Sequence, residues 1–195
     1  MSAQEQTVEV RVGTGGDPLT LGLPVFAVAS LALGMGCLGK PSGLAVVAPL
    51  IILTTGIFQV ITTVWAIIRG QSIVALIFAL FSGFWLTLGC VLIGTQHGWF
   101  GIPAGGTAGA LELIFICYST LFFFLLIPCL RLPVIYPITV ALIVVALAFA
   151  AAGALAITGY LALAFSFLGF WASLNVAHAA MGTKAFPPLG KPLLS

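Results

Sequence analysis

Polar residues recur along the second long apolar segment of the chain, at intervals that place them on one face of a helix. Thr55, Gln59, Thr62 and Thr63 follow one another at this spacing, so their hydroxyl and amide groups can exchange hydrogen bonds along a single line. A glutamine amide that faces lipid is costly, so we expect Gln59 to face protein or a water-filled path. Two interpretations stay open: hydrogen bonds between helices, or a pore lining that contacts a polar solute.

A second polar stripe lies in the last long apolar segment and consists of Trp171, Asn175, His178 and Gly182. Asn175 and His178 are one helical turn apart. A histidine near a helix end can titrate close to neutral pH, or it can be a neutral residue bonded to a neighbouring carbonyl. We therefore keep both Asn175 and His178 as candidates for contact with a solute.

Glu112 is the only acidic residue after Pro18, which makes its position informative. We expect it in the first turns of the fourth apolar segment, near the outer membrane surface. There its carboxylate can sit among lipid headgroups and favour the positive end of the helix dipole. The alternative is an acid at a vestibule that gates the path or relays protons.

Other chemistry is excluded by the motifs that the chain lacks. It has no nucleophile elbow, phosphate loop or metal-ligand spacing, and its four cysteines are not paired at CxxC spacing. We expect the cysteines to be small packing residues. The net charge of +2 comes without a basic cluster. The sequence therefore predicts no enzyme activity, no metal site, no cofactor and no nucleic-acid partner.

The composition places the chain in a lipid bilayer. Hydrophobic residues make up 62% of the sequence and charged residues 5%, which is too few charges to cover a water-soluble domain. The apolar runs are continuous, as in helices, and do not alternate as in barrel strands. We predict an all-α membrane protein with six transmembrane helices. The expected spans are Leu19–Leu38, Leu44–Ile68, Ser72–Gly94, Ala108–Ile127, Val134–Ala156 and Thr158–Met181.

The orientation follows from the positive charges in the short loops. Five of the six Lys and Arg residues fall on the side of the two termini, and only Lys40 falls on the other. We therefore predict a multi-pass protein of the cytoplasmic membrane with both termini cytoplasmic. The expected organisation is a flexible tail at residues 1–17, a membrane domain at 18–182 and a C-terminal tail at 183–195.

Several motifs of the first three spans resemble those of the acetate and succinate uptake transporter family, the YaaH-like permeases. That family opens its first span with N-P-A-P-L-G-L. The corresponding string here is Asp17-Pro18-Leu19-Thr20-Leu21-Gly22-Leu23. Where the family has G-I-x-Q in its second span, this chain has Gly56-Ile57-Phe58-Gln59. The family's R-G-N corresponds to Arg69-Gly70-Gln71, and its run ending in G-x-F-W-L corresponds to Ser82-Gly83-Phe84-Trp85-Leu86.

The resemblance implies a pore-type bundle of six transmembrane helices per protomer, with a narrow pore in each protomer, and a ring of protomers, a hexamer. It implies passage of a small monocarboxylate such as acetate, with or without a coupled proton. Phe26 and Phe81 would form the constriction, and Thr55, Gln59, Thr62, Asn175 and His178 would line the pathway. The membrane lipid and the carboxylate are then the expected partners, together with further copies of the chain.

Three positions depart from the family pattern. The family's glutamate after its tryptophan is Ala66 here, its tyrosine in the third span is Phe81, and its motif asparagine is Asp17. Because the changes at Ala66 and Phe81 remove hydrogen-bonding groups, a second hypothesis stays open. The chain would then be a structural or accessory membrane subunit of a larger complex, without transport activity.

Overall fold

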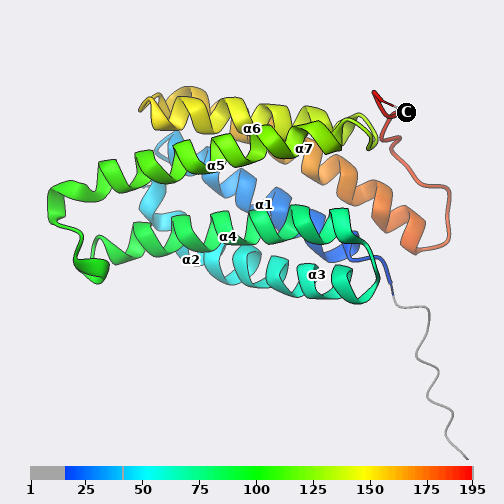
Figure 1. Ribbon diagram of the computed structural model, residues 1–195, viewed down its shortest axis with the longest axis horizontal. Coiled ribbons are helices and arrows are strands. Elements are labelled where there is room, and N and C mark those ends of the chain that lie inside the picture. The colour runs from blue at the N-terminus through cyan, green and yellow to red at the C-terminus, as the bar shows by residue number, and fades with distance from the viewer. Residues whose placement is uncertain (1–15, 41, 195) are drawn as a thin grey trace, which may run out of the picture.

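The computed structural model describes residues 16–40 and 42–194, and within them the regular structure is helical (Figure 1). The helices are α1 (Leu19–Cys37), α2 (Ala48–Leu50), α3 (Ile57–Ile68), α4 (Ser72–Gly94), α5 (Thr107–Cys129), α6 (Ile135–Ala151) and α7 (Leu155–Ala180). Short segments η1 (Leu44–Val47) and η2 (Ile51–Gly56) join α2 and α3 into one continuous span. Two further turns, η3 (Trp99–Gly101) and η4 (Ala104–Gly106), lie in the loop before α5.

The predicted six-helix membrane fold is confirmed. Five segments are long and apolar enough to cross a bilayer, and α6 is a shorter apolar helix. The second and third spans begin and end where the apolar runs placed them, because charged and glycine residues flank both. Residues 1–15, most of the expected N-terminal tail, lie outside the described residues.

The break between the last two spans differs from its expected position. The expected fifth span continued to Ala156, whereas α6 ends at Ala151 and α7 begins at Leu155. Gly153 has a φ of 75°, and the amide of Ala154 donates to the carbonyl of Phe149 at 2.8 Å. This is a Schellman motif, in which glycine takes the left-handed conformation that ends a helix. The same motif ends α1, α3 and α7.

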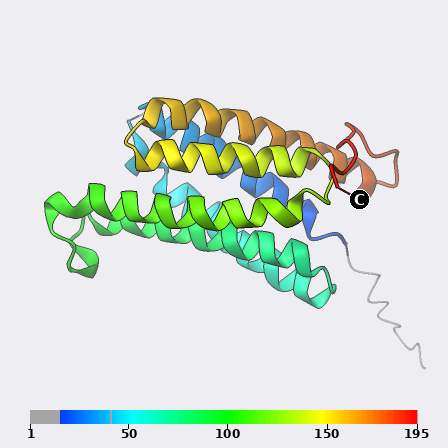
Figure 2. The same cartoon turned by 45° about the horizontal axis from the view of Figure 1, so that its top comes forward.

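The helices lie side by side along the long axis of the molecule, with α3 and α4 on one side and α6 and α7 on the other (Figures 1 and 2). Helix α1 runs between them and packs on both α7 and α3, while α5 packs on α6. Helix α1 therefore lies between these two groups of helices, and the interior of the bundle is built from the faces of several spans.

Small residues allow α1 and α7 to approach closely. A Cβ atom added to Gly34 would lie 3.0 Å from the carbonyl oxygen of Gly159, and one added to Gly169 would lie 3.1 Å from the Cβ of Ala27. The hydroxyl of Ser166 donates across this contact to the carbonyl of Ala27 at 2.8 Å. Backbone contact and interhelical hydrogen bonds hold helices together in lipid, where apolar burial alone does not.

Candidate functional site

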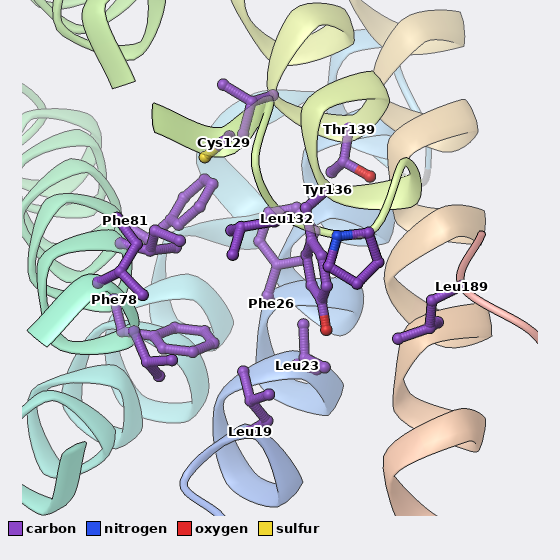
Figure 3. Close-up of a pocket in the computed structure, with 15 residues that line it drawn as sticks. Leu19, Leu23, Phe26, Phe78, Phe81, Cys129, Leu132, Tyr136, Thr139 and Leu189 are labelled. Carbon is purple, nitrogen blue, oxygen red and sulfur yellow. The ribbon is translucent and has the colours of Figure 1, made fainter. Parts of the chain in front are cut away.

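A cavity of about 270 Å³ lies inside the bundle, at the end where α1 and α4 begin. Helices α1, α4 and α6 supply most of its wall, and Cys129 at the end of α5 supplies part of it (Figure 3). The lining side chains of α1 and α4 include Leu19, Leu23, Phe26, Ile77, Phe78 and Phe81. The residues from α1 recur at intervals of three and four, so one face of this helix forms one side of the cavity.

An aromatic cluster closes the cavity toward the middle of the bundle. It consists of Phe26, Phe81, Phe122 and Phe165, all buried. The ring centroids of Phe26 and Phe81 are 4.8 Å apart, and those of Phe81 and Phe122 are 4.7 Å apart. The structure thus brings together Phe26 and Phe81, the two residues expected at a constriction, although they lie on different helices.

The polar stripe of the second span lies away from this cavity wall. Thr55, Gln59 and Thr62 are fully buried, and they face protein on the inner side of the span. Thr55 donates to the carbonyl of Val25 in α1 at 2.7 Å, and Thr62 donates to the carbonyl of Phe58 in its own helix at 2.9 Å. Neither hydroxyl lines the cavity. Thr55 therefore connects two helices, as the interhelical interpretation of the stripe predicts.

Gln59 is the exception in the stripe, because neither atom of its amide has a hydrogen-bond partner among the described residues. Both atoms are buried. Leaving a buried polar group unpaired costs about 1–3 kcal/mol. A polar ligand that bonded to the Gln59 amide would therefore gain more binding free energy than one that met Thr55 or Thr62, because the hydroxyls of these two residues already have partners.

The second stripe holds the C-terminal segment of the chain. The indole Nε1 of Trp171 donates to the carbonyl of Pro188 at 3.0 Å, and the Asn175 amide donates to that of Pro187 at 2.7 Å. His178 is partly buried, and its ring Nδ1 lies 3.2 Å from the hydroxyl of Thr183. Asn175 and His178 lie outside the cavity wall, and the Asn175 amide is engaged by Pro187.

The segment formed by residues 183–194, here termed the C-terminal strap, continues from α7 to the start of α6. The amide of Ile135 donates to the carbonyl of Leu189 at 3.2 Å, and the amides of Leu193 and Leu194 both approach the carbonyl of Leu130 at 3.0 Å. The side chain of Leu189 completes the cavity wall (Figure 3). The strap thus joins α7, α6 and the end of α5 around the cavity.

The family model described as the GPR1/FUN34/yaaH family matches residues 2–186. The chain belongs to the GPR1/FUN34/yaaH family. The fold is similar to that of a solved protein described as the bacterial acetate channel SatP, with a TM-score of 0.78 and 21% sequence identity. The match covers 89% of this chain and 99% of that one. A comparison with curated protein sequences gave no match.

In this member of the GPR1/FUN34/yaaH family, the first-span motif starts α1 and shapes the cavity. The Asp17 carboxylate accepts a hydrogen bond from the amide of Leu19 at 3.0 Å, and Pro18 is buried. Gly22 leaves room for the ring of Phe78 to pack against the backbone of α1. Leu23 lines the cavity, and Leu21 on the same helix is half-buried outside its wall.

Glu112 lies at the opposite end of the molecule from the cavity. It is exposed and borders a second hollow of about 550 Å³ between the start of α5 and the turn that joins α6 to α7. Ala150 and Gly153 line the same hollow. The single acidic side chain of the membrane domain therefore faces an accessible space rather than the bundle interior.

Sequence patterns gave no cavity role to several further wall residues, among them Tyr136, Val140 and Leu189. Tyr136 and Val140 are one turn apart in an apolar run without a polar stripe. Leu189 follows two prolines after the last span. The prolines predict an extended segment, but they do not predict which helix that segment contacts. Only the pairing of α6 with the C-terminal strap places these residues together.

Proposed function

We propose that each protomer conducts a small monocarboxylate such as acetate across the cytoplasmic membrane. The observation that carries this proposal is a cavity inside the helix bundle that ends at a contact between Phe26 and Phe81. A narrow aromatic contact in an apolar passage can gate by excluding water. Membership of the family and likeness in fold to an acetate channel support the same function.

The roles within this pathway are assigned as follows. Phe26 and Phe81 form the constriction. Gln59 lies outside the cavity wall, between Thr55 and Thr62 on its helix face, and its unpaired amide is the group that a carboxylate or its water would engage beyond the cavity. Asn175 and His178 act at the cytoplasmic end by holding the C-terminal strap beside the cavity.

The assembly and orientation complete the proposal. Both termini are cytoplasmic, because the positive charges favour that side. Several protomers form a closed ring, a hexamer, with one pathway each. Comparing the net charge that crosses the membrane with the amount of carboxylate that crosses it shows whether a proton accompanies the carboxylate, because the two together carry no net charge.

Current across a planar lipid bilayer tests the proposed function, because the acetate anion carries charge whereas the acid that leaks through lipid does not. Purified protein should conduct acetate. Phe26→Trp should abolish the current by filling the constriction. The matched control is Phe167→Trp, at a position that is 60% exposed on α7. A preparation that is folded and inserted, yet passes no acetate current and takes up no more labelled acetate than protein-free vesicles, would contradict the proposal.

A second candidate is a structural or accessory membrane subunit. The fully buried Ala66, which stands where the resembling family has a glutamate, and the apolar Phe81 favour it. This candidate predicts no acetate current and a stable complex with another membrane protein. Chemical cross-linking in native membranes, followed by mass determination, separates a homomeric ring from such a complex.

A further inference from the structure

The cavity wall is aliphatic and aromatic almost throughout. Leucines of α1, isoleucines of α4 and Leu189 of the strap face it, and none of the described residues that line it is charged. Figure 3 shows the side-chain oxygens of the wall at Tyr136 and Thr139. Cavities lined by Leu, Ile and Phe stay dry and take apolar ligands. The wall therefore favours an alkyl group over a hydrated anion.

The cavity is large for acetate. A cavity of about 150 Å³ holds benzene, with six carbon atoms, and this one has about 270 Å³. Acetate would bring one methyl group to the wall and leave most of the lining side chains without a contact. Filling the space with more carbon atoms gains dispersion energy at each new contact.

The two hydroxyls of the wall differ in their availability. The hydroxyl of Thr139 donates to the carbonyl of Ile135 at 2.7 Å. The hydroxyl of Tyr136 forms no hydrogen bond with any other described residue, and it points toward Leu23 of α1 (Figure 3). The cavity thus has a hydrogen-bonding group near the start of α1, and aromatic rings at its other end.

We propose that the cavity binds the alkyl chain of a monocarboxylic acid of about four to six carbons. The carboxyl group lies beside the hydroxyl of Tyr136, and the chain points toward Phe26 and Phe81. This inference rests on the proposed function and specifies its solute: short-chain aliphatic acids longer than acetate. Each added methylene raises the affinity about fourfold until the cavity is full.

Calorimetric titration of the protein in lipid nanodiscs tests this inference. The ligands are acetate, propanoate, butanoate and pentanoate, and empty nanodiscs provide the blank for partitioning into lipid. The expected result is an affinity that rises by about fourfold per methylene. Equal affinities along the series, or the tightest binding for acetate, would overturn the inference.

Two variants test the geometry. Leu23→Phe fills the cavity and should lower the affinity for pentanoate by about tenfold while sparing acetate. Its matched control is Leu31→Phe, at a position on the same helix that is 42% exposed. Tyr136→Phe keeps the shape of the wall and should weaken every acid about fivefold without changing the dependence on chain length. If Leu23→Phe does not fold, the Tyr136→Phe result decides, and a changed chain-length dependence would refute the placement of the carboxyl group.

The titration also separates this inference from the proposed function. Acetate current together with a flat chain-length series would overturn the alkyl site and leave the channel standing. A rising series with neither acetate current nor acetate uptake above that of protein-free vesicles would support the alkyl site and contradict the proposed passage. Neither binding nor current would overturn both.

Discussion

Replacing Gln59 by leucine should stabilise the protein. The side chain is fully buried and both of its amide atoms lack a partner among the described residues. Leucine has a similar size and contains no group that needs a hydrogen bond. Removal of the unpaired amide should therefore raise the free energy of unfolding by about 1–3 kcal/mol, which corresponds to a melting temperature higher by roughly 2–12 °C for a chain of this length.

Thr62→Val is the matched control, since Thr62 is equally buried on the same helix face but its hydroxyl is bonded to Phe58. It should lower stability by about 0.5–1.5 kcal/mol. Thermal melting in one detergent measures both variants, and acetate current in planar bilayers shows whether the amide also serves conduction. The proposed role of Gln59 requires that the stabilised variant conduct less. If Gln59→Leu instead melts well below the parent, the amide has a partner in the native protein and the reasoning from an unpaired group is wrong.

Three further predictions follow from single contacts. Phe81→Tyr should raise acetate current, because a hydroxyl at the constriction can bond the carboxylate; equal currents would show that this ring does not meet the solute. Asn175→Ala removes the 2.7 Å hydrogen bond to the strap, so the strap should uncover the cavity more often. In a background without other cysteines, a cytoplasmic thiol reagent should then label Cys129 about fivefold faster. Ser173→Ala, which breaks a bond only within α7, is the control and should not change the rate; equal rates in the two variants would argue against a strap that covers the cavity. Gly153→Ala should lower stability by about 1–2 kcal/mol in thermal melts, because its φ of 75° is strained for alanine, and an unchanged melting temperature would contradict this.

The number and type of the helices could be predicted because backbone groups in lipid must pair within their own segment. An apolar run that is long enough to cross the bilayer therefore forms a transmembrane helix. The end of α6 could not be placed as well, because glycines at 153 and 159 both fall near the break and only Gly153 takes the left-handed conformation.

The candidate site was predictable only in part. The spacing of Thr55, Gln59 and Thr62 identified the inward face of a helix, which they do occupy, but spacing does not reveal which neighbour lies opposite. That face meets other helices rather than the cavity. Phe26 and Phe81 came from the family resemblance. The resemblance also covered Leu189 but gave it no place in the cavity wall, because its position depends on how the strap folds back onto α6.

The shortness of α6 has a consequence for the lipid around the protein. Its 17 residues span roughly 26 Å, whereas the hydrocarbon core of a typical bilayer is about 30 Å thick. Its neighbour α7 has 26 residues and can cross a bilayer of that thickness even when tilted. The bilayer beside α6 should therefore become thinner to match the length of this helix, at a cost of fractions of a kcal/mol per ångström of mismatch. The lipid bilayer around the protein should accordingly be thinner beside α6 than beside α7. The protein should also partition preferentially into regions of membrane that are already thin.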